Sequence, residues 1–506
     1  MCSAFLSKIF REFNTFAWRI TRMKQFDRIR KNIIGIDEKV KNQFGEFPLI
    51  YADWIASGRL YRPIEERICE TIGPWVANTH TETSLTGTLM THAYHEARDI
   101  IKQHVNASKN DVLLTTGFGM TAGINKLQRI MGLKYCGKLK DGNSCLGANE
   151  RPVVFITHME HHSNHTSWYE TVADVVVIPP GKDLLFDLNI MEDTIKKYKD
   201  RKVKIGSFSA ASNVTGIMNP VHKMAAMMHK YGGVAFVDYA ASAPYVDMDM
   251  HPGKDNYLDG IFFSPHKFLG GPGSSGVLIF NSDLYDSPSP DNPGGGTVEW
   301  TNPWGEYMYI DDIEAREDGG TPGFLQAIRT ALCLSLKDDM GTQNIREKED
   351  ILLEKAFTAF DKIDGIHILA TESRERLGVI SFYHEKIHFN LMVKLLNDRF
   401  GIQVRGGCAC AGTYGHYLLD VSHEKSKHIT DLINSGDLSE KPGWIRFSMH
   451  PTMTVEEVEY VADAVKQIVK YSAEWGSEYR YDNHKNEFYH KDEPKLHSTV
   501  SGWLKL

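Results

Sequence analysis

The sequence predicts an α/β protein with a large domain on a mostly parallel sheet and a smaller α+β domain after it. Short apolar segments alternate with helix-forming segments between residues 111 and 280, a pattern typical of parallel α/β sheets. Several of these segments are apolar throughout, as strands covered on both faces should be. The length of 506 residues exceeds one ordinary core, which favours a second domain.

Seven segments of the large domain are predicted strands, and helices are expected between some of them. The predicted strands are Asp111–Leu114, Val153–Thr157, Asp174–Ile178, Lys204–Ala210, Val234–Asp238, Ile261–Ser264 and Gly276–Phe280. The predicted helices between strands include Met191–Tyr198 and Val221–Tyr231.

The segment 283–323 interrupts this pattern with repeated proline and glycine residues. Such a run is incompatible with regular structure throughout. Long loops inside compact proteins are usually functional or lie at an interface. Two predicted helices follow, Leu325–Met340 and Arg346–Phe360.

The remaining chain is typical of a smaller α+β unit. Its predicted strands are Ile366–Leu369, Gly378–Phe382, Gln403–Val404 and Trp444–Ser448. Its predicted helices are Phe389–Phe400 and Val455–Tyr471. The tail from Glu474 is rich in Tyr, His and charged residues, and we expect a surface extension there.

The composition excludes several classes of protein. The formal net charge of −8 offers no electrostatic attraction to nucleic acid or an anionic membrane. No stretch approaches the roughly 18 apolar residues of a membrane span. Seven thinly spread cysteines, an odd number, are not a disulfide scaffold and favour a reducing, cytoplasmic location.

The first 30 residues mix apolar and basic side chains without a continuous apolar core. A secretory signal is therefore not expected. An amphipathic surface helix and an organelle-targeting segment both stay open. The simpler interpretation is that translation starts at Met23.

Lys267 follows a predicted strand, in a small polar turn that also holds Ser264 and His266. Ligands of α/β sheets bind beyond the carboxyl ends of strands, and a lysine there can form an imine with a carbonyl. Ser264 and His266 could meet a phosphate. Asp238 ends another predicted strand about thirty residues upstream. An acid at this position can simply cap a turn, or it can keep a cofactor's pyridine nitrogen protonated.

A glycine turn, Gly117-Phe118-Gly119, lies between a predicted strand and a helix start at Met120 and Thr121. The free amides and the dipole of a helix N-terminus bind anions. Further on, His158, His161, His162 and His165 invite a metal interpretation. Their spacing matches no defensible zinc pattern, so we expect no metal. A flat imidazole stacked on a planar cofactor fits equally well.

Taken in order, these motifs resemble the class V aminotransferase superfamily, and most closely its cysteine desulfurase/selenocysteine lyase branch. The resemblance covers about residues 51–471. The motifs that carry it are Glu160-His161-His162-Ser163-Asn164, Ser209-Ala210-Ala211-Ser212-Asn213-Val214-Thr215-Gly216, Val237-Asp238 and Ser264-Pro265-His266-Lys267. The resemblance implies a fold-type I pyridoxal-phosphate (PLP) enzyme that works as a homodimer on a small amino acid.

The resemblance also implies roles for individual residues. Lys267 would carry PLP as a Schiff base, Asp238 would pair with the pyridine nitrogen, and His161 would stack on the ring. Asn213 would approach the ring oxygen or the substrate. The phosphate would be held by the backbone of Met120 and by the side chains of Thr121, Ser264 and His266. Thr321 would contact the phosphate of the neighbouring subunit.

A loop near the C-terminus resembles the catalytic-cysteine loop of the same branch, with Cys410 at the nucleophile's position. A thiolate there would accept the substrate sulfur as a persulfide. Arg446 matches the arginine that binds the substrate carboxylate, a task suited to a planar guanidinium. Two departures from the family bear on the reaction. Ala241 stands where the family usually has glutamine. Cys408 and Ala409 stand where related loops often have histidines, and the second thiol leaves open which cysteine reacts.

The sequence thus predicts a PLP-dependent cysteine desulfurase that forms alanine and passes sulfur, or selenium, to an acceptor. The alternatives are another class V reaction (transamination, β-elimination or epimerisation) and a non-catalytic metal-binding or structural protein. The predicted domains are an N-terminal extension (1–30), a segment packing with the small domain (31–75), the PLP-binding domain (76–330), the small domain (331–472) and a C-terminal extension (473–506).

Overall fold

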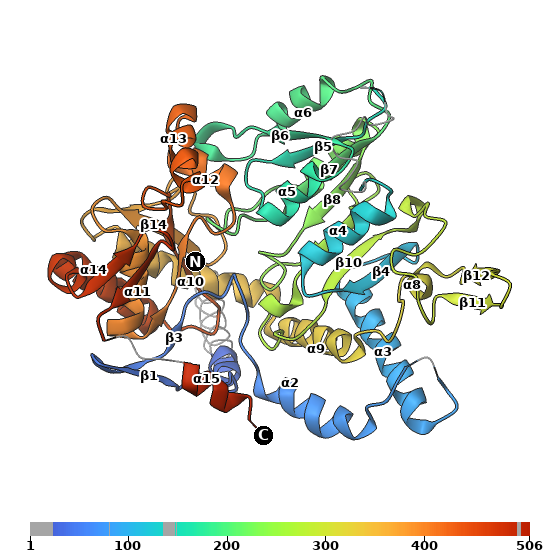
Figure 1. Cartoon of the computed structure of the whole chain (residues 1–506), viewed down its shortest axis with the longest axis horizontal. Coiled ribbons are helices and arrows are strands. Elements are labelled where there is room, and N and C mark those ends of the chain that lie inside the picture. Colours follow the sequence, from blue (N-terminus) through green and yellow to red (C-terminus); the bar gives the residue numbers. More distant parts are fainter. Residues whose placement is uncertain (1–23, 80, 135–146, 148, 493–496, 506) are drawn as a thin grey trace, which may run out of the picture. The chain divides into compact units, whose positions relative to one another are not determined.

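A computed structural model describes residues 24–79, 81–134, 147, 149–492 and 497–505 (Figure 1). Most of the predicted N-terminal extension, with Cys2, and also Cys136 and Cys145, lies outside these residues. Contacts within the chain define two compact units. Unit 1 holds the described residues up to Ile34, Trp54–Lys348 and Glu372–Leu377, and unit 2 holds Gly35–Asp53, Glu349–Thr371 and the described residues from Gly378 onward.

Unit 1 is built on a seven-stranded sheet in the order β4-β10-β9-β8-β7-β5-β6. The strands are β4 (Asp111–Thr116), β5 (Val153–Thr157), β6 (Asp174–Ile178), β7 (Lys204–Ser209), β8 (Val234–Asp238), β9 (Gly260–Phe263) and β10 (Gly276–Asn281). Neighbours from β6 to β9 pair in parallel, while β10 is antiparallel to both β4 and β9. The predicted, mostly parallel α/β sheet is confirmed.

Helices pack on this sheet because their apolar faces meet its buried strands. The helices of unit 1 are α2 (Arg62–Glu66), α3 (Leu85–His104), α4 (Met120–Ile130), α5 (His162–Tyr169), α6 (Leu188–Lys196), α7 (Val221–Lys230), α8 (Ile313–Arg316) and α9 (Phe324–Met340); α10 (Thr342–Phe360) begins in unit 1 and ends in unit 2. In one core cluster, Ile124 and Leu127 of α4 and Trp168 of α5 meet strand residues such as Phe236 and Phe262.

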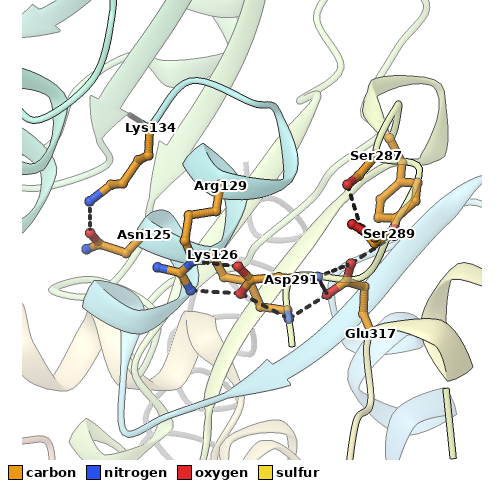
Figure 2. Close-up of polar contacts among 9 residues, drawn as sticks. Asn125, Lys126, Arg129, Lys134, Ser287, Ser289, Asp291 and Glu317 are labelled. Carbon is orange, nitrogen blue, oxygen red and sulfur yellow. Dashed lines mark hydrogen bonds and ion pairs between the residues drawn. The ribbon is translucent and has the colours of Figure 1, made fainter. Parts of the chain in front are cut away.

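The proline- and glycine-rich segment 283–323 contains a hairpin that the sequence pattern did not indicate, β11 (Val298–Thr301) with β12 (Tyr307–Tyr309). A buried charge network joins this segment to α4 (Figure 2). Lys126 Nζ lies 2.6 Å from the buried carboxylate of Glu317. Arg129 donates two hydrogen bonds, of 2.5 and 2.8 Å, to Asp291. Since Asp291 N also donates to Glu317, the segment is held firmly against α4.

Unit 2 contains an antiparallel sheet in the order β13-β14-β17-β16. Its strands are β13 (Ile366–Ile368), β14 (Val379–His384), β16 (Arg405–Gly407) and β17 (Trp444–Ser448), and its helices include α11 (Phe389–Phe400), α12 (Gly412–Leu418), α13 (His423–Asn434) and α14 (Val455–Gly476). A hairpin of β1 (Lys39–Asn42) with β2 (Gly45–Pro48) and a parallel pair of β3 (Ile50–Tyr51) with β15 (Ile402–Gln403) complete the strands near this sheet.

The C-terminal tail continues as a hairpin of β18 (Tyr479–Asp482) with β19 (Glu487–His490), followed by α15 (His497–Trp503). Tyr479 is buried, and its hydroxyl donates a 2.9 Å hydrogen bond to Asp398 of α11. Glu478 pairs with Arg399 of the same helix at 2.6 Å. The hairpin is therefore an integral wall of unit 2 rather than a simple surface extension. No helix in the described part of the chain is long and apolar enough to span a membrane.

Candidate active site

Lys267 and Asp238 lie at the carboxyl ends of neighbouring parallel strands in unit 1. Asp238 is the last residue of β8 and pairs in register with Phe262 of β9, and Lys267 closes the short turn that follows β9. Burial raises the pKa of Asp238 to about 7; the nearby Glu160 charge also raises it, whereas the Ala240 amide and the Lys267 ammonium lower it. A buried carboxyl thus lies within the electrostatic reach of the predicted Schiff-base lysine.

A polar cradle forms where the turn before α4 meets the turn after β9. The Met120 amide donates a 2.9 Å hydrogen bond to Ser264 Oγ, and His266 Nδ1 donates a 2.8 Å bond to the Phe118 carbonyl. The two turns approach so closely that a Cβ on Gly119 would lie 2.9 Å from Ser264 Oγ and 3.0 Å from His266 Cε1. A side chain at position 119 would therefore displace Ser264 or His266. Both residues lie against the N-terminus of α4, and helix N-termini bind anionic groups.

Thr121 and His161 meet the same region through a shared neighbour. Thr121 Oγ1 lies 2.7 Å from Ser163 Oγ, and His161 Nδ1 accepts a 3.1 Å hydrogen bond from Ser163 N. His161 is the N-cap residue of α5, so its ring is fixed where the helix begins. The structure therefore brings together Thr121 and His161, two residues that the sequence pattern places forty positions apart.

The sequence predicted no role for Glu160, although this residue opens one of the motifs that carry the resemblance, yet it organises this edge of the sheet. Its fully buried carboxyl group accepts hydrogen bonds from Thr157, Ser209 and Asn164. Burial raises its pKa above the usual range. Because Thr157 ends β5 and Ser209 ends β7, Glu160 ties two strand ends together directly before His161. The only sign of this role in the sequence was the position of a carboxylate directly before the histidine pair.

Asn213 lies in a buried turn after β7. Ser212 Oγ accepts hydrogen bonds from Val214 N at 3.1 Å and from Thr215 N at 3.3 Å, which fixes the turn. The Ala210 amide donates a 2.8 Å bond to the Asp238 carbonyl, so the Asn213 turn begins beside the end of β8. Ala241 is buried in the next turn.

Thr321 is exposed, and its hydroxyl donates a 3.4 Å hydrogen bond to Asn78. No residue of the cradle takes part in this bond. The role of Thr321 toward a second subunit stays a prediction.

Arg446 and the two thiols lie in unit 2. Arg446 is in the middle of β17, its side chain is buried, and its guanidinium lies 2.7 Å from Asp53, an acidic partner that the sequence did not suggest. Burial lowers the pKa of Arg446, while Asp53 opposes that shift.

Cys408 and Cys410 lie in the turn between β16 and α12, and both are half-buried. Ala409 and Cys410 adopt consecutive left-handed conformations, with φ of 50° and 57°. This conformation costs a non-glycine residue roughly 1–2 kcal/mol, and such strain is concentrated at functional sites. The turn therefore holds the predicted nucleophile in an unusual backbone geometry.

The structure thus gathers the predicted cofactor residues other than Thr321 at one edge of the unit 1 sheet. It describes Arg446 and Cys410 separately, within unit 2. In the described part of the chain, no three His, Cys, Asp or Glu side chains form a group suited to a metal ion.

Comparison with known proteins agrees with this geometry. Residues 50–461 match the family model of class-V aminotransferases. A probable cysteine desulfurase of Halalkalibacterium halodurans is 28% identical over 76% of this chain and 88% of its own length. One from Staphylococcus epidermidis is 30% identical over 74% of this chain and 85% of its own length.

Solved structures show the same fold. A cysteine desulfurase from Thermococcus onnurineus, solved in its apo form, superposes with a TM-score of 0.69 at 23% identity, covering 88% of this chain and 98% of that one. A cysteine desulfurase from Escherichia coli gives a TM-score of 0.64 at 23% identity, covering 84% and 96%. The sheet and its neighbours define a fold-type I pyridoxal-phosphate fold. The chain belongs to the class-V aminotransferase family.

Proposed function

We propose that this protein is a PLP-dependent cysteine desulfurase, which moves the sulfur of L-cysteine to Cys410 and releases alanine. The observation that carries the proposal is the buried Asp238 carboxyl beside Lys267, together with a polar cradle whose close packing requires glycine at position 119. The relatives named as cysteine desulfurases, and the strained turn at Cys410, support the choice of reaction.

The residues of unit 1 fit this cofactor. Lys267 would hold it covalently through Nζ, and the cradle at Met120, Thr121 and Ser264 would hold its phosphate. Asp238 would accept the hydrogen bond of the pyridine nitrogen, and His161 would cover the ring. When bound, pyridoxal phosphate supplies an electron sink joined to the amino group of the substrate.

The chain's own residues then carry out the remaining chemistry. The Arg446 guanidinium would bind the substrate carboxylate, and Lys267 would move the proton at the α-carbon. The Cys410 thiolate would attack the substrate sulfur, forming an S–S bond while the C–S bond breaks. The electron pair and a proton go to the former sulfur-bearing carbon, which gives alanine, and the sulfur stays on Cys410 as a persulfide.

We further propose that the enzyme acts as a homodimer in a reducing compartment such as the cytoplasm. The predicted role of Thr321 at a neighbouring subunit's phosphate, and its exposure in the single chain, support the dimer. Sulfur would leave Cys410 to an acceptor.

Product analysis with L-cysteine tests the reaction. With dithiothreitol as acceptor, the wild type should release alanine and sulfide in equal amounts. Cys410→Ser should lose this activity at least a hundredfold, while Cys408→Ser, the matched change two residues away, should keep most of it. Pyruvate in place of alanine would instead support a β-elimination, the alternative that the missing glutamine at Ala241 leaves open. Equal activity in Cys410→Ser and wild type would exclude this thiol.

A further inference from the structure

A cavity of about 620 Å³ lies within unit 2 against the turn that carries both thiols. Cys408, Ala409 and Cys410 line one side of it, α11 lines another, and residues 485–489 of the C-terminal hairpin form a further wall. That hairpin lies beyond the residues that match the family, which end at 461. The cavity is of the size of a small-molecule site, and part of its wall lies outside the residues that match the family model.

The charged side chains of this cavity are mostly basic. Lys394, Arg405, Lys441 and Lys485 line it, against one acidic residue, Glu487. The excess of positive charge contrasts with the net charge of −8 for the whole chain. In a concave site, clustered charge of one sign concentrates ligands of the opposite sign.

Three of these basic residues have no ion-pair partner of their own. Across the described residues, Arg405, Lys441 and Lys485 lie in no ion pair within 4.0 Å; Lys485 Nζ lies 5.8 Å from the centre of the Tyr489 ring. Arg405 and Lys485 are exposed and Lys441 is half-buried, so their charges face solvent along the cavity wall. These charges are available to an anion from outside the chain.

We infer that this cavity binds a small thiol bearing carboxylate groups, which serves as the acceptor of the sulfur held on Cys410. The inference rests on the proposed function, since it needs a persulfide at Cys410. The basic side chains would hold the carboxylates while the acceptor thiol reaches the cysteine turn. A volume of about 620 Å³ accommodates a molecule as large as a tripeptide.

The transfer step balances without any further reagent. The acceptor thiolate attacks the outer sulfur of the Cys410 persulfide, so that a new S–S bond forms and the S–S bond to Cys410 breaks. Cys410 leaves as a thiolate, and the proton released by the acceptor thiol returns to it. The acceptor becomes a persulfide, and no external oxidant or reductant is consumed.

Binding is tested first, with a probe that cannot react. S-methylglutathione, a tripeptide with two carboxylates and a blocked thiol, is titrated calorimetrically into the full-length, PLP-loaded protein. It should bind, and each of Lys441→Gln and Lys485→Gln should weaken binding about tenfold, the loss of one charge-assisted hydrogen bond. Lys485→Glu should weaken it further.

Lys466→Gln is the matched control, because Lys466 is an exposed lysine of unit 2 on α14, outside the cavity lining. It should bind S-methylglutathione as the wild type does. The inference is overturned if S-methylglutathione does not bind, or if the cavity variants and Lys466→Gln bind it equally well.

Turnover separates this inference from the proposed function. With L-cysteine as donor, glutathione should support alanine formation with a kcat/KM at least tenfold above that of glutathione ethyl ester, which has the same thiol and one carboxylate fewer. This ratio should fall toward one in Lys441→Gln/Lys485→Gln. Absence of alanine even with dithiothreitol would overturn the proposed function itself. Alanine formation with dithiothreitol but equal use of glutathione and its ester would overturn only the acceptor site.

Discussion

The amide of Met120 donates a hydrogen bond of 2.9 Å to Ser264 Oγ, which joins the first residue of α4 to the turn after β9. This bond brings Gly119 so close to Ser264 and His266 that no side chain fits there. The backbone of Gly119 is extended, with φ of 163°, so any residue could adopt it. Glycine is therefore required for space and not for its conformational freedom.

Gly119→Ala should displace the side chains of Ser264 and His266. It should thereby weaken the binding of PLP at least tenfold, while the fold is kept. The measurement is a spectroscopic titration of the cofactor-free protein with PLP. Gly295→Ala is the matched control, because a Cβ on Gly295 would meet nothing within 4 Å. If the two variants bound PLP with equal affinity, the phosphate would not lie at the cradle beside Gly119.

Asp238→Asn should change how stability depends on pH in the cofactor-free protein. Burial raises the pKa of Asp238 from 3.8 to about 7, so the folded state binds a proton that the unfolded state releases between these values. The contribution of Asp238 to stability is thus fully present below about pH 4 and is lost as pH rises to about 7. The full shift corresponds to about 4 kcal/mol.

The observable is the difference in the free energy of unfolding between wild type and Asp238→Asn, measured with urea at several pH values. This difference should fall by about 4 kcal/mol between pH 4 and pH 7. Asp283→Asn, a change at an exposed carboxylate, should show no such trend. A constant difference across this range would contradict the shifted pKa.

Glu317→Gln should destabilise unit 1 by about 3–5 kcal/mol, because it leaves the ammonium of Lys126 buried without a full countercharge. The Glu317 carboxylate is completely buried and also accepts a 2.8 Å hydrogen bond from Tyr285. Urea unfolding measures the effect. Asp193→Asn breaks the exposed pair with Lys196 and should change stability far less. If both variants were equally stable, the network of Figure 2 would have no structural role.

Ala409→Gly should be neutral or stabilising by up to about 1 kcal/mol. Relief of the left-handed conformation gains roughly 1–2 kcal/mol, and loss of a buried methyl group costs about 0.8 kcal/mol. Ala411→Gly, two residues on, relieves no such conformation, since its φ is −135°, and should destabilise. Thermal or urea unfolding measures both changes in stability. Changes of the same sign and size in the two variants would show that the left-handed conformation of Ala409 is not strained.

Much of the fold could be predicted because its strands are apolar and end in polar residues. The strand Val234–Asp238 was predicted with the bounds that the structure shows, since its apolar run stops at the acid. The hairpins β11–β12 and β18–β19 were missed. Their residues are largely polar or exposed, and the first lies in a segment whose prolines and glycines hide short strands.

The predicted site residues depended on local motifs, and the missed ones depend on distant partners. Lys267, Asp238 and Thr121 each belong to a strand-end motif that is visible in the sequence. Glu160 acts through Ser209, and Asp53 through Arg446. A contact between residues that are 49 or 393 positions apart leaves no local sequence pattern. The roles of Glu160 and Asp53 are therefore visible only in the folded structure.

Reduction with borohydride identifies the lysine that carries the cofactor. The purified protein is incubated with PLP, reduced, digested and analysed by mass spectrometry for the peptide that carries the cofactor. We expect a yellow protein before reduction and a single pyridoxyl-modified peptide that contains Lys267, with the label lost in Lys267→Ala. A protein that binds no PLP, or a label that persists in Lys267→Ala at another lysine, would exclude Lys267 as the Schiff-base lysine.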